Sequence, residues 1–217
     1  MEELFKYAAE KVKDADPLGL GTGRTVRGLI KYLHEAGALK GKTLVTSSVD
    51  TELALAELGY VVSGLTVRPK AYVDGFDAFL EEEFVLIKGG GGAMTREKIV
   101  AYNSDFRLYI SDSSKVKRDK FVVVPVEVLS FALHSVLRKL RMEGFEASVR
   151  VGQGKMGPVV SDNGNPIVDV TVERGKVREL TSVLDSIPGV VEHGVFYRDL
   201  IEEVAVFDNG LVKVRVK

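Results

Sequence analysis

Short apolar runs alternate with amphipathic stretches along the first 120 residues of this chain. Apolar residues recur at helical spacing from Leu4 to Val12, and a second such stripe begins at Val26 and ends near Gly37. Between these stretches lie brief runs rich in Val, Leu and Ile, which are typical of buried strands. Strands that alternate with helices in this way predict an α/β fold with a Rossmann-like, mostly parallel sheet and helices on both faces.

The same periodicity places the individual elements of this part of the chain. Helices are expected near 4–12, 26–36, 50–58 and 95–102, and strands at 18–20, 43–46, 84–87 and 108–110, with further strands near Val61 and Ala71.

Beyond Lys120 the pattern changes to that of a smaller α+β unit. Helices are expected at 128–140 and 177–184, half-exposed antiparallel strands at 146–151 and 166–172, and further strands at 121–124, 190–196, 204–207 and 211–216. We therefore expect a Rossmann-like catalytic domain formed by residues 1–120 and 192–217 and a small α+β domain at 121–191. In this arrangement the last strands return to the first sheet.

Composition narrows the possible functions. The net charge of the 217 residues is -1 at pH 7, so we expect no general attraction to nucleic acid or to an anionic membrane. The absence of cysteine excludes thiolate nucleophiles and cysteine metal sites, and the three histidines have no metal-ligand spacing. We expect neither a metal nor a cofactor. Because the chain has no signal-peptide pattern and no apolar run of ~18 residues, we expect a cytoplasmic protein.

The segment 21–25, Gly-Thr-Gly-Arg-Thr, lies between a predicted strand and a predicted helix. Glycines allow close backbone approach, and the first N–H groups of a helix can hold a phosphate. The alternative is an ordinary turn capped by threonine. A Walker loop would need a lysine after the glycines, and a dinucleotide fold would need an acidic residue where Ser47 and Ser48 stand. The hydroxyl groups of Ser47 and Ser48 are better suited to bind phosphate or sugar oxygens.

Two further loops carry charged groups. Asp74 and Asp77 lie at the end of an apolar run. Taken alone, two carboxylates around a glycine are also typical of an ordinary solvated turn. A second apolar strand ends at Lys88, and the four glycines 89–92 separate it from a helix that carries Glu97 in its first turn. Glu97 alone is equally explained by the helix dipole. Four consecutive glycines are costly in conformational entropy, so this loop favours backbone approach to a ligand.

Together these groups predict carbonyl chemistry on a small sugar phosphate. Moving a proton between adjacent carbons of an aldose and a ketose requires one base that reaches both carbons. It also requires charge stabilisation for an enediolate oxygen. Glu97 and Lys88 are the candidates for these two tasks.

Eight segments carry a specific resemblance: GLGTGRT (19–25), TSSVDTELALAELGY (46–60), VDGFD (73–77), LIKGGGGAMTREKIVA (86–101), DSSK (112–115), PVEV (125–128), VVSDNGNPIVDV (159–170) and IPGVVEHGVF (187–196). In these segments, which follow the family order over nearly the whole length, the chain resembles ribose-5-phosphate isomerase type A. The resemblance implies a metal-free, cofactor-free aldose–ketose isomerase that interconverts D-ribose 5-phosphate and D-ribulose 5-phosphate through an enediolate. It also implies a place in the non-oxidative pentose phosphate pathway and assembly as a homodimer or homotetramer.

The resemblance also assigns roles to residues. The general base of the family falls on Glu97, and its other catalytic positions match Lys88, Asp74 and Asp77. With the two hydroxyls discussed above, the expected substrate-binding residues are Thr22, Gly23, Arg24, Thr25, Ser47, Ser48, Gly75, Phe76, Gly89, Gly90, Gly91 and Lys115.

Two departures from the family pattern bear on the substrate. Arg24 replaces the serine of the first loop, where its guanidinium either strengthens phosphate binding or points to solvent. Phe76 and Ala78 replace an alanine and a glutamate, and Phe76 either narrows the sugar pocket or packs beneath it. A non-catalytic sugar-phosphate sensor and a related deaminase or acyl-transfer enzyme are the alternative functions. Turnover measured on several sugar phosphates separates the three.

Overall fold

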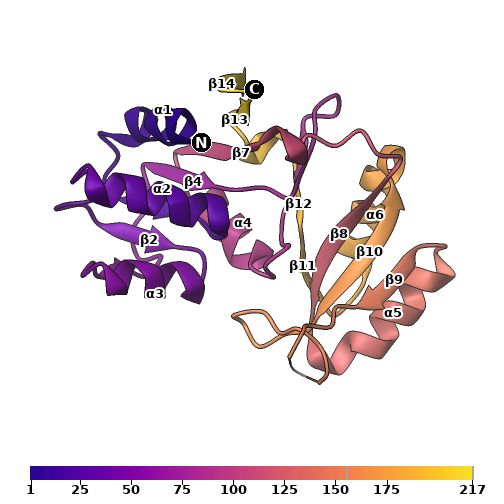
Figure 1. The fold of residues 1–217 in the computed structure, drawn as a ribbon. Helices are drawn as coiled ribbons and strands as arrows, with labels where there is room; N and C mark the ends of the chain where they lie inside the picture. Colours follow the sequence, from indigo (N-terminus) through magenta and orange to yellow (C-terminus); the bar gives the residue numbers. More distant parts are fainter. Residues whose placement is uncertain (155, 217) are drawn as a thin grey trace. The chain divides into compact units, whose positions relative to one another are not determined.

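The computed structural model describes residues 1–154 and 156–216 (Figure 1). The chain divides into two compact units. The first comprises Met1–Phe76, Arg96–Val116 and Phe196–Lys217, and the second comprises Asp77–Thr95 and Lys117–Val195. The boundaries expected from the sequence, after residues 120 and 191, lie close to the observed transitions after Val116 and Val195. Segment 77–95, which was expected in the first domain, groups with the second unit instead.

The first unit is built on a seven-stranded sheet with the order β14-β13-β7-β4-β1-β2-β3. Neighbouring strands run parallel except for the antiparallel pair β13 and β14. The predicted mostly parallel sheet and the return of the last strands to it are therefore confirmed. The strands are β1 (Leu18–Leu20), β2 (Leu44–Thr46), β3 (Val62–Ser63), β4 (Ala71–Asp74), β7 (Phe106–Asp112), β13 (Glu203–Asp208) and β14 (Leu211–Val216).

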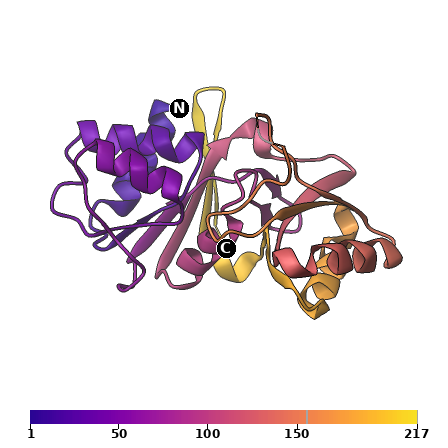
Figure 2. The same ribbon diagram turned by 90° about the horizontal axis from the view of Figure 1, so that it is seen from below.

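Helices cover both faces of this sheet (Figure 2). The first face carries α1 (Glu2–Val12), α2 (Arg24–Glu35) and α3 (Val49–Glu57), and the opposite face carries α4 (Met94–Tyr102). Side chains alternate along a strand, so Ala71 and Val73 join the core beneath α1 and α2 while Tyr72 and Asp74 point to the face of α4. Each fully buried aliphatic side chain of that core contributes about 1.5–3 kcal/mol.

The second unit has the predicted α+β character. Its antiparallel sheet has the order β11-β8-β10-β9, and a smaller sheet has the order β12-β6-β5. Short 3₁₀ turns occur in both units. The elements of the second unit are β5 (Ala78–Leu80), β6 (Val85–Ile87), β8 (Phe121–Val128), β9 (Glu146–Val149), β10 (Ile167–Glu173), β11 (Val190–His193), α5 (Leu133–Met142) and α6 (Val177–Ser186), with β12 (Val195–Phe196) at its boundary and the turns η2 (Ser130–Ala132) and η3 (Arg174–Lys176). The turns η1 (Ser113–Lys115) and η4 (Arg198–Leu200) belong to the first unit.

One expected helix begins later than predicted. The apolar residues from Val128 fit a helix or a strand, and the structure extends β8 through Val128 and begins α5 at Leu133. The N–H of Val128 donates to the carbonyl of Pro166 at 3.1 Å, which keeps this residue in the sheet. Among the described residues, no helix combines the length and apolarity that a membrane crossing requires.

Candidate functional site

The carboxyl ends of three neighbouring strands meet at the centre of the first sheet. β1 lies between β2 and β4. The chain that leaves β1 continues to β2 on one side, and the chain that leaves β4 continues toward β7 on the other side, so the two connections leave this edge of the sheet in opposite directions. In open α/β sheets, ligands bind at such points. The N–H of Gly21 donates to the Val73 carbonyl at 2.8 Å, and the N–H of Ser47 donates to the Leu20 carbonyl at 3.2 Å. These bonds hold the three loops side by side.

The loop after β1 leads directly into α2. Gly23 precedes the helix with a φ of 98°, a conformation that favours glycine, and exposed Arg24 and half-buried Thr25 begin the helix. The N–H of Thr22 donates to Oδ1 of Asp74 at 3.1 Å. The structure therefore brings this loop to the carboxylate at the end of β4.

The two serines after β2 take different positions. Ser47 is fully buried, and its Oγ lies 3.3 Å from the hydroxyl oxygen of Tyr72, within hydrogen-bond distance. Ser48 caps α3 by accepting from the N–H of Thr51 at 3.2 Å, and its hydroxyl donates to Oγ1 of Thr22 at 2.8 Å. Ser48 thus lies at the first loop, whereas Ser47 supports Tyr72 from within the core.

Asp74 is fully buried among hydrogen-bond donors. Its Oδ1 accepts from the N–H groups of Thr22 and Gly75, the latter at 2.7 Å, and its Oδ2 accepts from the Tyr72 hydroxyl at 2.5 Å. The hydroxyl bond requires that Tyr72 stays neutral. Burial, followed by the charge of Asp74, raises the pKa of Tyr72 well above its usual value, so the donor persists across the neutral pH range.

Glu97 lies on α4 in the same buried cluster. Only 2% of its surface is exposed. Its carboxylate adds to the raised pKa values of both Tyr72 and Tyr109, after burial and the charge of Asp74. The rings of Tyr72 and Tyr109 pack edge to face with centroids 6.5 Å apart. Two predicted catalytic carboxylates, Asp74 and Glu97, therefore share one apolar, tyrosine-lined region of the first unit.

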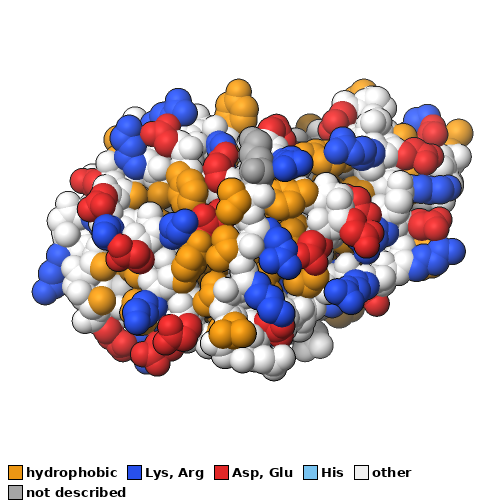
Figure 3. Space-filling model, turned by 90° about the horizontal axis from the view of Figure 1, so that it is seen from above, with side chains coloured by type: hydrophobic (Ala, Val, Ile, Leu, Met, Phe, Trp, Pro, Cys, Tyr) orange, Lys and Arg blue, Asp and Glu red, His pale blue; other side chains and the backbone are white. Residues whose placement is uncertain are grey.

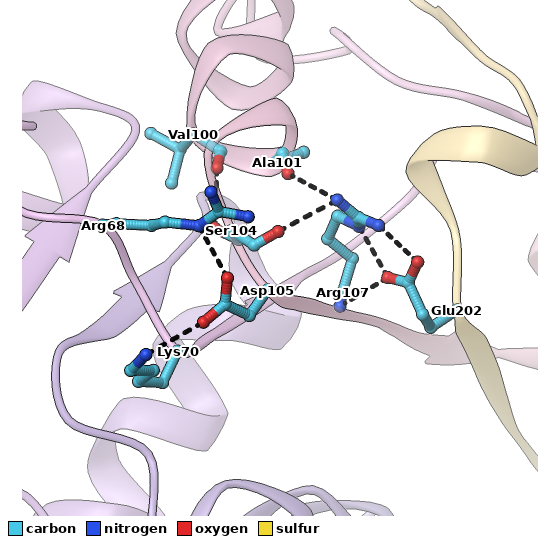
Figure 4. Close-up of polar contacts among 8 residues, drawn as sticks. All are labelled: Arg68, Lys70, Val100, Ala101, Ser104, Asp105, Arg107 and Glu202. Atoms are coloured by element: carbon cyan, nitrogen blue, oxygen red, sulfur yellow. Dashed lines mark hydrogen bonds and ion pairs between the residues drawn. The ribbon is translucent and has the colours of Figure 1, made fainter.

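The C-terminal end of α4 is held by Arg107 (Figure 4). Its Nη1 donates to the carbonyl of Ser104 at 3.0 Å and of Ala101 at 3.3 Å, and its guanidinium also pairs with the carboxylate of Glu202. A cation at the C-terminal end of a helix complements the helix dipole. These contacts anchor the helix that carries Glu97.

Lys88 and Asp77 belong to the second unit. Lys88 directly follows β6, is 2% exposed, and donates its N–H to the Gly194 carbonyl at 2.8 Å. A Cβ atom at Gly194 would lie 2.0 Å from the Lys88 carbonyl oxygen, so this close approach requires glycine. Oδ2 of Asp77 accepts from the N–H of Gly90 at 2.7 Å. The structure thus brings Asp77 and the glycine loop together.

The remaining predicted residues lie on the loops that join these elements. Phe76 is 5% exposed, and Gly75 is half-buried. Gly89 is buried and Gly91 is exposed, while Lys115 is half-buried at the end of η1. Within the parts of the chain that the structure describes, no three acidic or histidine side chains form a group that would hold a metal ion.

The first unit also contains a cavity of about 290 Å³ at the ends of β2 and β3. Its polar lining includes Ser48, Ser63 and Arg96, of which only Ser48 was predicted from the sequence. Tyr72 was also missed, although it stands two residues before Asp74 on one strand. The period of two residues in a strand was a usable signal for Tyr72, whereas Arg96 and Ser63 carried no local signal.

Comparisons with known proteins identify the family of the chain. The family model for ribose 5-phosphate isomerase A (phosphoriboisomerase A) matches residues 43–210. The ribose-5-phosphate isomerase A of Archaeoglobus fulgidus is 40% identical over 205 residues, which cover 92% of this chain and 91% of that protein. The isomerase A of Methanocaldococcus jannaschii is 38% identical over 221 residues, covering 99% of this chain and 96% of that protein.

Solved structures give the same result for the fold. The structure of the Methanocaldococcus jannaschii ribose 5-phosphate isomerase A has a TM-score of 0.87 and 35% identity, over 100% of this chain and 99% of that one. A D-ribose-5-phosphate isomerase in complex with phospho-erythronic acid has a TM-score of 0.85 and 32% identity, with the same coverage. The chain belongs to the ribose 5-phosphate isomerase A family.

Proposed function

We propose that Glu97 is the general base of the aldose–ketose isomerisation of this family, the interconversion of D-ribose 5-phosphate and D-ribulose 5-phosphate. Its carboxylate moves a proton between C1 and C2 of the open-chain sugar through an enediolate. The observation that carries this proposal is the burial of Glu97 in one cluster with Asp74. A carboxylate that is buried near phenol side chains and shielded from water is suited to abstract a proton from carbon and to return it.

Lys88 and the N–H groups of the glycine loop stabilise the negative charge of the enediolate oxygen in this mechanism. Asp74 and Asp77 hold sugar hydroxyls or assist ring opening. The close contacts of Asp77 with Gly90 support a shared role for that carboxylate and the loop. Preorganised donors of this kind lower the barrier without reorganising during the reaction.

The phosphate binds at the start of α2, to residues 22–25, with help from Ser48 and Lys115. The free N–H groups at a helix N-terminus favour an anion there. Ser47 acts indirectly, through the contact of its hydroxyl with that of Tyr72. The burial of Phe76 supports the interpretation that its ring packs beneath the sugar. That a related isomerase binds phospho-erythronic acid supports a phosphorylated sugar as the ligand.

Replacement of Glu97 by Gln tests the assignment, because the amide cannot accept the proton. We expect kcat to fall by about 10²–10⁴, with KM changed much less. Glu57→Gln, which changes an exposed glutamate at the end of α3, is the matched control and should keep full activity. In deuterated water the wild type should incorporate solvent deuterium at C1 or C2. Near-normal turnover of Glu97→Gln would refute the assignment.

The proposed chemistry uses neither metal nor cofactor. We expect EDTA to leave the rate unchanged, and inhibition that a divalent ion reverses would indicate a metal mechanism instead. Ribose 5-phosphate should be turned over in preference to amino-sugar phosphates, which separates the isomerase from a deaminase or a sensor.

We place the enzyme in the cytoplasm as a homodimer or homotetramer that binds neither nucleic acid nor membrane. Basic and acidic side chains are interspersed on the face shown in Figure 3, in keeping with the net charge of -1. Sedimentation equilibrium measures the oligomeric state, and a monomer would contradict this assignment.

A further inference from the structure

One guanidinium holds the glycine turn after β6 from one side. Nη1 of Arg150 donates to the carbonyl oxygens of Gly89 at 2.7 Å and of Gly90 at 3.1 Å. Arg150 follows β9, far along the chain from the turn, and no motif of the sequence pointed to it. Two adjacent carbonyls bound by one cation fix the orientation of both peptide planes.

Asp169 fixes the guanidinium in turn. Nε and Nη2 of Arg150 donate to the two carboxylate oxygens of Asp169 at 2.8 and 2.5 Å, a two-pronged pair that sets the plane of the fork. Asp169 lies on β10, a central strand of the antiparallel sheet. The backbone N–H of Arg150 also donates to the carbonyl of Ile167 at 2.8 Å. The Arg150 side chain is 16% exposed, so solvent screens these contacts only in part.

Fixed peptide planes also fix the direction of their N–H groups. The C=O and N–H of a planar trans peptide point in opposite directions. The carbonyls of Gly89 and Gly90 face Arg150, so the N–H groups of Gly90 and Gly91 face away from it. The N–H of Gly90 meets Asp77, and Gly91 is exposed. The cation also polarises both peptides, which strengthens their N–H groups as donors.

We infer that Arg150, oriented by Asp169, is a positioning residue for the isomerisation. It holds the turn so that the N–H of Gly91 is directed at the oxygen on which negative charge develops and the Asp77 carboxylate stays beside Gly90. This inference rests on the proposed function, in which the turn binds the enediolate. Lysine cannot replace Arg150, because a single ammonium lacks the fork that reaches Asp169 and two carbonyls at once.

Arg150→Gln and Arg150→Lys are compared with Arg174→Gln as the control. Arg174 is matched in environment: it belongs to the second unit, its side chain is 15% exposed, and it pairs with Glu83 through two nitrogens. We expect both Arg150 variants to lower kcat by about 10–100-fold, the effect of a small misplacement of catalytic groups. KM should change by less than about threefold, because the lost interaction acts on the transition state. Arg174→Gln should keep the kcat of the wild type.

A second measurement follows the turn itself. In protein labelled with ¹⁵N-glycine, hydrogen exchange of the Gly90 and Gly91 amides should be faster in Arg150→Gln than in the wild type and in Arg174→Gln. Asp169→Asn, which loosens the fork but keeps the cation, should show smaller changes in the same direction and serves if Arg150→Gln does not fold. Unchanged kcat, or unchanged exchange at both amides, would overturn the inference. Failure of the proposed function is recognised separately, by full activity of Glu97→Gln.

Discussion

A Cβ atom at Gly21 would lie 1.9 Å from Oδ1 of Asp74 and 2.0 Å from its Cγ. The backbone of the first loop therefore passes so close to this buried carboxylate that only glycine fits. The same approach allows the N–H of Thr22 to donate to Asp74. The glycine at this position serves the placement of a carboxylate rather than the flexibility of the loop.

Gly21→Ala should therefore displace Asp74 or the loop. We expect a loss of about 1–3 kcal/mol of unfolding free energy, as for an overpacked core, and a fall of about 10² in kcat/KM through misplacement. Gly175→Ala is the control, because a Cβ there meets no atom within 4 Å and the residue is exposed. Chemical denaturation and steady-state kinetics measure both effects. Wild-type activity of Gly21→Ala would show that the close approach is dispensable.

Tyr72 and Tyr109 should make the protein lose stability in alkaline solution. Burial, and then the charge of Asp74, raises both pKa values well above 10 in the folded state. The unfolded phenols ionise near pH 10, so above that pH the folded state binds more protons than the unfolded state. The stabilisation is complete below about pH 10 and decreases as the pH rises further.

Tyr72→Phe should flatten this decrease, because one of the two buried phenols is removed. Urea denaturation at a series of pH values from about 8 to 11 measures the slope. Tyr102→Phe, at a residue that is 74% exposed, should leave the wild-type slope unchanged. Parallel curves for Tyr72→Phe and the wild type would contradict the prediction.

Glu202→Gln should weaken the anchor of α4. The side chains of Arg107 and Glu202 are 14% and 26% exposed, and the pair is partly shielded from solvent. Loss of its charged hydrogen bonds should cost about 1.5–3 kcal/mol in unfolding free energy. Arg68→Ala, which breaks a pair with side chains 69% and 37% exposed, should cost about 0–1 kcal/mol. Equal costs for the two variants would show that burial does not decide the difference.

Glu127→Gln should destabilise the second unit. This fully buried carboxylate accepts hydrogen bonds from four side chains, those of Thr95, Ser161, Asn163 and Asn165. An amide presents an NH₂ group to donors and leaves at least one of them unsatisfied, at a cost of about 1–3 kcal/mol. Glu146→Gln, on an exposed position of β9, should be neutral. A neutral Glu127→Gln in thermal unfolding would contradict this role of the charge.

Much of the fold was predictable because local apolar periodicity decides element type. The strand at 18–20 has the predicted bounds, and α6 begins at the predicted residue, Val177. β5 was missed because Ala78–Leu80 is too short to show alternation and becomes a strand only by pairing with β6. The start of α5 was predicted too early because Val128 and its neighbours suit both periods.

The sequence by itself determined the residue types of the reaction and the order of strands and helices that carry them. Asp74 and Lys88 stand where apolar strands end, Asp77 follows in the loop after Asp74, and Glu97 stands in the first turn of a helix. Only the tertiary structure decided what surrounds these groups: the Thr22 N–H on Asp74, Glu202 on the Arg107 that holds the end of α4, and Arg150 on the glycine turn. The physical reason is that such contacts join residues far apart along the chain. Strand order and register set these distances, and no local pattern encodes them.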